Sequence, residues 1–215
     1  MKRTLYIGDV HGCIDELEEI LAKFGPVEGD SLYQTGDVIN KGPDSYRALK
    51  LIVDTGILTV LGNHEESFLR LLHHPESWRE KDRLRIQAIK EVEFFESVIS
   101  TWPLWRDTPH ALLVHAGLEP GKERLEEMDP KVLVSVRFWT DGRPWFESVK
   151  WPKRIVFGHW AQLGFVCRPD VIGLDSGCVY GKQLTAWCPE EGKFYTVDAH
   201  KVYSPVNKKF DAAGV

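Results

Sequence analysis

Three loops of similar composition follow short apolar stretches in the first third of the chain. Each loop joins a glycine to a polar side chain that can bind a metal ion, and these side chains are Asp9, Asp37 and Asn63. They are 28 and 26 positions apart (37 − 9 and 63 − 37), as expected for one strand and one helix per interval. Because parallel strands present their carboxyl ends at one edge of a sheet, we expect the three side chains to lie together.

The apolar pattern around these loops alternates between two periods. Short apolar stretches predict strands at 5–7, 31–35 and 57–61. Helical spacing predicts helices at 14–24, 43–53, 65–72 and 82–100. The first third of the chain is therefore predicted to form a right-handed parallel sheet with helices on its faces.

The pattern changes in the second half of the chain. Further strands are predicted at 111–114, 154–157, 171–174, 184–187 and 194–197. The last two flank a Pro-Glu-Glu-Gly turn that predicts a hairpin, and we expect this half to form a second, mostly antiparallel sheet. The segment 119–153 is poorly periodic, which indicates a cap or an extended loop over the site. We expect one domain over residues 1–198 and a polar, frayed tail over 199–215.

Composition restricts the classes of partner. The net charge of −5 provides no overall attraction for polyanions, so we expect no nucleic-acid partner. No apolar run approaches the roughly 20 residues of a membrane span, so we expect no membrane partner. The four cysteines form no C-x-x-C pair, and a reducing cytoplasm is the expected compartment. None of them begins the C-x₅-R arrangement of cysteine phosphatases, so Cys178 is expected to be a buried or loop thiol.

Two histidines in the second half repeat the pattern of the first three loops. His115 and His159 each follow a predicted strand, with Gly117 two positions after the first and Gly158 directly before the second. Carboxylate, amide and imidazole donors suit Mn²⁺, Fe, Co²⁺ or Zn²⁺, and the absence of cysteine from these motifs argues against a structural zinc site there. Any single motif is a weak indicator, but their joint occurrence at successive strand ends predicts a metal site.

In this order, the motifs resemble those of the calcineurin-like phosphoesterases, and within them the phosphoprotein phosphatase branch. The motifs are GDVHG (8–12), GDVINKG (36–42), GNHE (62–65), HAG (115–117) and GH (158–159). Shorter motifs are similar to those of the bacterial symmetrical diadenosine tetraphosphatases: Gly42-Pro43 followed by Ser45, Arg137-Phe138, GHWA (158–161) and LDSGC (174–178). The resemblance implies a four-layer α/β/β/α sandwich, an α/β fold with two central sheets.

The resemblance also assigns roles by position. It implies one metal ion held by Asp9, His11 and Asp37, and a second held by Asp37, Asn63, His115 and His159, with Asp37 as the bridge. The ions would be Mn²⁺ first, with Fe, Co²⁺, Zn²⁺ or Mg²⁺ as alternatives. Two cations about 3.5–4 Å apart can share a hydroxide and neutralise phosphoryl oxygens during in-line attack. His64 would protonate the leaving oxygen, and Arg137 would clamp phosphate.

Two positions depart from the relatives that act on phosphoproteins, which carry Asp and Arg where this chain has Asn40 and Lys41. Asn40 is expected to hold His64 less firmly as a proton donor, and Lys41 cannot grip phosphate with two parallel hydrogen bonds. Both changes matter less for a phosphoanhydride, whose leaving group is already a stable anion. Together with the resemblance to the symmetrical tetraphosphatases, which implies the substrate, these changes make symmetrical hydrolysis of diadenosine tetraphosphate to two ADP the preferred function. The alternatives are a Ser/Thr phosphoprotein phosphatase and a non-catalytic sensor of nucleotide or phosphoprotein.

Three further residues are candidates for supporting roles. Trp139 and Trp145 lie near the predicted site loops, and stacking on a nucleobase is an alternative there to core packing. Asp175 either orients a metal ligand from behind or serves a turn, and the sequence favours neither role.

Overall fold

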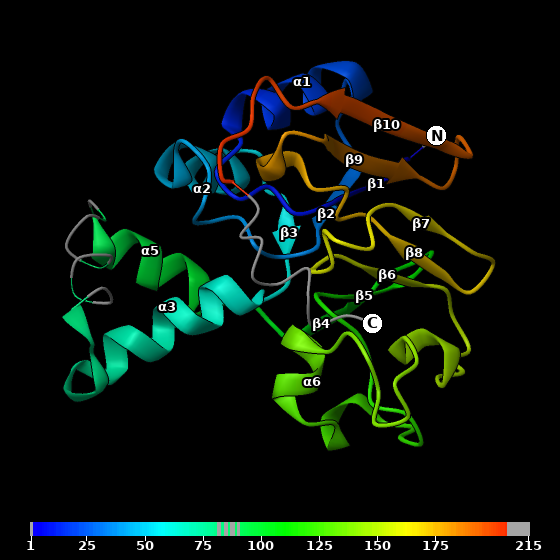
Figure 1. Cartoon of the computed structure of the whole chain (residues 1–215). Coiled ribbons are helices and arrows are strands. Elements are labelled where there is room, and N and C mark those ends of the chain that lie inside the picture. The colour runs from blue at the N-terminus through cyan, green and yellow to red at the C-terminus, as the bar shows by residue number, and fades with distance from the viewer. Residues whose placement is uncertain (1, 81–82, 84–85, 87–88, 90, 206–215) are drawn as a thin grey trace.

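The computed structural model describes residues 2–205 except 81–82, 84–85, 87–88 and 90. The described strands form two five-stranded sheets that lie face to face between outer layers of helices (Figure 1). The first sheet has the order β10 (Lys193–Asp198), β9 (Gln183–Cys188), β1 (Thr4–Ile7), β2 (Ser31–Gln34), β3 (Leu58–Thr59). The second has the order β4 (Trp105–Asp107), β5 (Leu112–Val114), β6 (Ile155–Phe157), β8 (Val171–Gly173), β7 (Val166–Cys167). The predicted α/β/β/α architecture is confirmed.

Strand direction agrees with the prediction in one sheet and not in the other. β1, β2 and β3 are parallel, as predicted. β9 and β10 form the predicted antiparallel hairpin, but they extend the first sheet by pairing with β1. The second sheet is parallel at its centre, where β6 pairs with β5 and β8, so the prediction of a mostly antiparallel sheet is wrong. Short apolar runs carry no information on direction, and long crossovers connect these central strands.

The continuous apolar runs of the central strands are explained by burial on both faces. Tyr6, Leu113, Val156 and Ile172 point between the sheets and form a shared inner core with Trp187. Residues beside these on the same strands pack instead against the helices. Because both faces of β1, β5, β6 and β8 are covered, these strands lack the alternating polar pattern of a half-exposed sheet.

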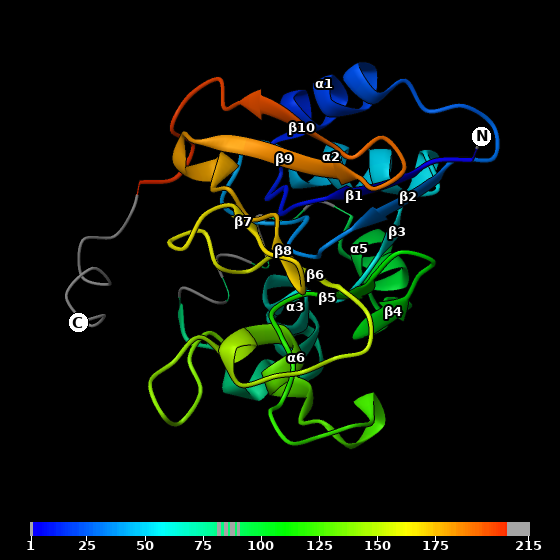
Figure 2. The same cartoon turned by 90° about the vertical axis from the view of Figure 1, so that its right-hand side faces the viewer.

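Helices cover the outer face of the first sheet and one side of the molecule (Figures 1 and 2). They are α1 (Ile14–Phe24), α2 (Ser45–Asp54), α3 (Asn63–His73), the short η1 (Pro75–Ser77) and α5 (Val92–Ile99). α1 has the predicted bounds, whereas α2 begins two residues later than predicted because the Asp44 side chain accepts a hydrogen bond from the N–H of Arg47 (2.9 Å) and caps the helix. The helix predicted over 82–100 is α5 only in its last part, and seven positions of 81–90 lie outside the described residues.

The segment 119–153 forms much of the layer outside the second sheet. It contains the short helices η2 (Leu125–Glu127), α6 (Pro130–Ser135) and η3 (Trp145–Glu147). Their apolar side chains pack on β5, β6 and β8 in a second outer core. The prediction of an irregular loop missed α6, because six residues are too few for a clear helical period.

The chain stays packed beyond β10. The backbone N–H of His200 and the hydroxyl of Tyr203 both donate to Glu16 of α1, each at 2.8 Å. This part of the predicted tail therefore lies on the domain, and residues 206–215 are outside the described residues. Within the described part of the chain, no helix has both the length and the apolarity needed to cross a membrane.

Candidate metal centre

The six predicted metal ligands lie together at the carboxyl ends of strands from both sheets. Asp9 and His11 follow β1, Asp37 follows β2, Asn63 follows β3, His115 follows β5, and His159 follows β6. The two halves of the chain meet directly, because the backbone N–H of His159 donates to Asp9 Oδ2 at 2.8 Å across 150 positions. The convergence that the spacing predicted for one sheet therefore extends across both.

Three imidazoles are oriented in the same manner. In each ring one nitrogen lies within hydrogen-bond distance of a backbone carbonyl, which fixes the tautomer and leaves a lone pair on the other nitrogen. The bonds join His11 Nδ1 to Ile39 O (3.2 Å), His115 Nδ1 to Thr35 O (2.8 Å) and His159 Nε2 to Ser135 O (3.1 Å). This second bond is the usual companion of an imidazole that ligates a metal.

The second nitrogen of each ring lies close to the oxygen donors. His11 Nε2 lies 3.6 Å from Asp37 Oδ2, and His115 Nε2 lies 3.5 Å from Asp37 Oδ1. Asn63 Oδ1 lies 3.0 Å from His115 Nε2 and 2.8 Å from His159 Nδ1. Asp37 thus presents one oxygen to each set of donors, which is the arrangement required of a carboxylate shared by two cations.

Asp37 belongs to two groups of possible metal ligands. Within each group, the donor atoms all lie within 4.8 Å of one another. One joins it to His115 and His159, and the other joins it to His11 and His64. The second group includes His64, which the sequence placed outside the ligands, and omits Asp9. The oxygens of Asp9 are instead bonded to Thr35 Oγ1 (2.7 Å) and to the N–H of His159.

The charges at the centre fit bound cations. Burial raises the pKa of Asp37 to about 7, and it also raises the pKa of Asp9 and of Asp175. Repulsion from Asp175 and Asp37 adds to the rise in the pKa of Asp9. Burial lowers the pKa of His115 to about 4 and that of His159 below its usual value, so both rings are neutral at neutral pH. Neutral imidazoles and crowded, desolvated carboxylates form a donor set that a divalent cation would neutralise.

Glycines of the motifs make room for the carboxylates. A Cβ atom on Gly158 would lie 1.9 Å from Asp9 Oδ1, and one on Gly62 would lie 2.4 Å from Asp37 Oδ1. Any side chain at either position would displace a predicted ligand. Glycine at these two positions is therefore required by the approach of a carboxylate from a neighbouring loop.

Backbone strain is concentrated at the same loops. Positive φ angles occur in His11 (48°), Asp37 (57°) and His159 (67°), and also in Asn40 (72°) and Lys41 (66°). Among the described non-glycine residues, Glu91 alone shares this conformation outside the predicted site. Such conformations cost free energy and persist where the surrounding structure requires a particular side-chain direction.

Two supporting residues were not predicted. Glu65 is fully buried and accepts hydrogen bonds from the backbone N–H groups of Asp37 (2.9 Å), Ile39 (3.0 Å) and Gly62 (3.2 Å). Thr35 binds Asp9 through its hydroxyl and His115 through its carbonyl. The position of Glu65 in the first turn after Gly62 is a capping pattern that could have indicated its role, whereas the contacts of Thr35 depend on the packing of the two sheets.

The predicted catalytic residues surround the metal ligands. Asn40 Nδ2 lies 3.2 Å from His64 Nδ1, and Lys41 Nζ lies 3.2 Å from His11 Nε2. Arg137 follows α6, and its Nη2 lies 3.5 Å from the carbonyl of His159. Its Nε is buried with no hydrogen-bond partner among the described residues. The structure therefore brings all four candidates to the centre.

Asp175 and Trp145 were left with two alternatives each, and the structure separates them. The Asp175 carboxyl is buried beside that of Asp9, with which it shares a hydrogen bond, and it also accepts the N–H of Gly177 (3.1 Å). It therefore both supports a predicted ligand and closes a turn. Trp145 has no exposed surface, so the alternative of nucleobase stacking is wrong for this residue.

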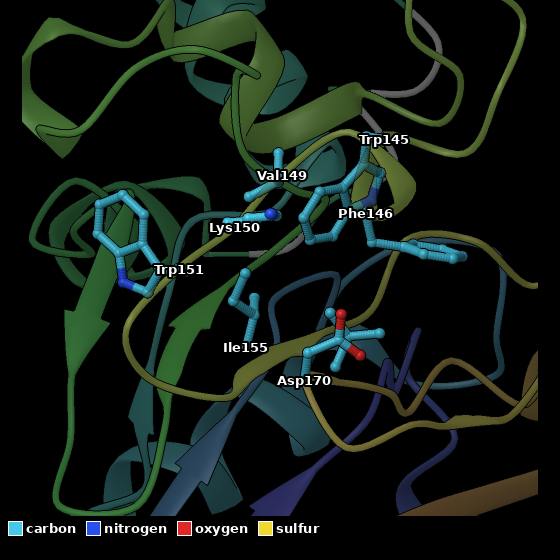
Figure 3. A pocket seen from close by; sticks show the side chains of 8 residues that line it. Trp145, Phe146, Val149, Lys150, Trp151, Ile155 and Asp170 are labelled. Carbon is cyan, nitrogen blue, oxygen red and sulfur yellow. The ribbon is translucent and has the colours of Figure 1, made fainter.

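The Trp145 ring packs against Gly117 of the HAG motif, and its backbone N–H donates to the carbonyl of Arg137 (3.0 Å). It borders a cavity of about 140 Å³ with Phe146, Lys150 and Trp151, at the starts of β6 and β8 (Figure 3). His159 follows the opposite end of β6. Trp139 is half-buried, and its predicted role remains untested.

Comparison with known proteins agrees with this geometry. The family model described as calcineurin-like phosphoesterase matches residues 2–197. A symmetrical bis(5'-nucleosyl)-tetraphosphatase of Vibrio parahaemolyticus is 27% identical, with 91% of this chain and 98% of that protein covered. The protein of the same name from Aggregatibacter actinomycetemcomitans is 30% identical, with 92% and 98% covered.

Solved structures show the same fold. The crystal structure of a provisionally named diadenosine tetraphosphatase is 30% identical, covers 92% of this chain and 94% of that chain, and superposes with a TM-score of 0.83. A Saccharomyces cerevisiae protein serine/threonine phosphatase shares the fold at 16% identity and a TM-score of 0.57, with 93% and 81% covered. By its sequence, its fold and the donor set at its strand ends, the chain belongs to the calcineurin-like phosphoesterase family.

Proposed function

We propose that the chain is a metal-dependent hydrolase that uses two divalent cations, Mn²⁺ first, to split diadenosine tetraphosphate into two molecules of ADP. One observation carries the proposal: three buried imidazoles, each fixed by a backbone carbonyl, face Asp37 and Asn63. Asp9, His11 and Asp37 would hold one cation, and Asp37, Asn63, His115 and His159 the other. Bound cations supply charge neutralisation for the phosphoryl oxygens and a lowered pKa for water.

The remaining residues bind phosphate and move a proton. His64 stands at the edge of the centre, with Nε2 4.0 Å from Asp37 Oδ2. In the protonated ring both nitrogens carry a hydrogen. With the Asn40 amide turned so that its oxygen accepts from Nδ1–H, Nε2 would give its proton to the leaving oxygen and the ring would return to the neutral form. Arg137 and Lys41 would orient the phosphate chain through their cationic groups.

The substrate proposal rests on the names of the relatives and on the residue that contacts the proposed proton donor, His64. The relatives that cover most of the chain are named symmetrical tetraphosphatases. Asn40 offers His64 an amide in place of a carboxylate, so stabilisation of a protonated imidazole is weaker. A departing ADP needs less help from an acid than a serine alkoxide does, and the chain therefore favours an anhydride.

The product distribution tests this proposal. With Mn²⁺ and diadenosine tetraphosphate we expect two ADP, without ATP or AMP, identified by ion-exchange chromatography. A phosphoserine peptide and p-nitrophenyl phosphate serve as parallel substrates. Faster turnover of the peptide would favour the Ser/Thr phosphatase alternative. Binding without turnover of any of the three would favour the non-catalytic sensor.

Asn40→Asp is expected to change substrate preference. A carboxylate against His64 Nδ1 should strengthen the proton donor, so kcat/KM for a phosphoserine peptide should rise about tenfold relative to that for diadenosine tetraphosphate. Steady-state kinetics on both substrates give the ratio. Changes in equal proportion would show that Asn40 does not set the leaving-group preference.

Phe138 offers a surface for a nucleobase where Trp145 does not. Its side chain is 54% exposed, and its ring packs edge-on against Trp160 with ring centroids 4.8 Å apart. Phe138 follows Arg137 and Trp160 follows His159, so this aromatic pair borders the centre. Because a stacked base contributes about 1–3 kcal/mol, Phe138→Ala should raise KM for diadenosine tetraphosphate about tenfold.

The Phe138→Ala experiment has an internal reference. Turnover of p-nitrophenyl phosphate, which lacks a nucleobase, should be unchanged in the same preparation. Val202→Ala is a matched control, because Val202 is 61% exposed and packs over Gly181 rather than beside Arg137. An unchanged KM for the dinucleotide in Phe138→Ala would exclude this residue from base binding.

A further inference from the structure

A second cluster of possible metal-binding side chains lies behind the centre. It consists of Cys13, Glu16 and Cys178, whose donor atoms all lie within 4.8 Å of one another. Cys13 is the residue before α1, Glu16 lies in the first turn of that helix, and Cys178 begins η4 (Cys178–Tyr180). Their exposed fractions are 0%, 0% and 1%, so the cluster is sealed from solvent.

The carboxylate of Glu16 is satisfied on one oxygen only. Oε1 accepts the N–H of His200 and the hydroxyl of Tyr203, each at 2.8 Å. Oε2 is buried and has no hydrogen-bond partner among the described residues. Burial of a carboxylate oxygen without a hydrogen-bond partner costs free energy. A cation bound to this oxygen would offset that cost. The two thiols beside it are the groups that would complete such a site.

We propose that Cys13 Sγ, Cys178 Sγ and Glu16 Oε2 bind one zinc ion, separate from the pair of cations at the centre. Thiolates with a carboxylate are a zinc-type donor set, unlike the oxygen and imidazole donors of the centre. Two zinc–sulfur bonds of about 2.3 Å at a tetrahedral angle hold the sulfurs about 3.8 Å apart, so donor atoms that lie within 4.8 Å of one another would move together by at most about 1 Å. Binding releases the two thiol protons to solvent, and the oxidation state of sulfur does not change.

The zinc ion would stabilise the loops that carry the centre. Cys13 lies two positions after His11, and Cys178 lies three positions after Asp175. The ion would tie the start of α1 to the turn after β8, and through Glu16 to the segment at His200 and Tyr203. This role does not depend on the substrate proposed above.

Cobalt substitution separates the two sites. A thiolate bound to Co²⁺ gives an intense charge-transfer band in the near ultraviolet, and none of the proposed ligands of the centre is a cysteine. We expect this band when Co²⁺ is added to the metal-free protein under reducing conditions, and we expect its loss in Cys178→Ser. Cys167→Ser, at an exposed position, and Cys188→Ser, at a buried one, should both retain it.

Two further measurements keep the test decisive. Elemental analysis should give one zinc ion more per chain in the parent protein than in Cys178→Ser, with circular dichroism reporting whether the variant is folded. If Cys178→Ser does not fold, Glu16→Gln should retain the fold and bind cobalt more weakly. A parent protein without the band, or with Cys13 and Cys178 joined in a disulfide after purification under reducing conditions, would overturn the proposal.

Discussion

Asp37→Asn is expected to lower kcat/KM by about 10³-fold or more for every substrate, because removal of the shared carboxylate costs several kcal/mol of charge stabilisation. Asp37 faces His11 on one side and His115 on the other, so its loss affects both proposed cations. Asparagine has nearly the same size and keeps an oxygen that can accept the N–H of His64 (2.9 Å in the parent). Kinetics and the metal content of the variant are the two measurements.

Asp54→Asn is the matched control for this experiment. Asp54 lies at the end of α2, pairs with Lys50 at 2.8 Å, and has a side chain that is 54% exposed. The same chemical change there should leave both metal content and turnover unaltered. An Asp37→Asn variant that kept the full metal content of the parent and more than about a tenth of the parent activity would contradict the bridging role.

His64→Gln is expected to lower kcat by about 10²–10⁴-fold on a substrate with a poor leaving group, with KM almost unchanged. The loss should be largest for a phosphoserine peptide and smaller for diadenosine tetraphosphate and p-nitrophenyl phosphate, whose leaving groups depart without a proton. A plot of the loss against leaving-group basicity therefore reports proton donation specifically. Equal losses on all three substrates would contradict this role.

Metal content distinguishes the two roles open to His64. Its ring lies among donors that could bind a cation, so a variant that lost a metal ion would assign His64 to the ligands. His73→Gln is the matched control, since it lies on the same helix with a side chain that is 58% exposed. That variant should match the parent in kinetics and metal content.

The sequence predicted those features that depend on local order. α1 was predicted with its observed bounds, because its apolar residues and the change in pattern at Gly25 are local signals. The convergence of Asp9, Asp37 and Asn63 also followed from spacing, since parallel strands with helical crossovers leave little freedom in where their ends lie.

Features that depend on distant contacts were missed. The carbonyl of Ser135 fixes His159, yet it belongs to a helix too short to show a period. The sequence could not show that Trp145 is buried and Phe138 exposed. The position of the Trp145 ring depends on its packing against Gly117, and that of the Phe138 ring on its packing against Trp160. The sequence also did not predict which strand β9 pairs with, since its pairing with β1 joins segments about 180 positions apart.

The pairing of β9 with β1 has a consequence for synthesis of the chain. Until residues 183–188 leave the ribosome, β1 keeps an unpaired edge, and Tyr6 lacks the stacked ring of Trp187 (centroids 5.4 Å apart). The amino-terminal strands, although made first, thus wait for nearly the whole polypeptide before their sheet is complete. Nascent chains stalled before residue 183 should consequently depend on chaperones to shield that edge.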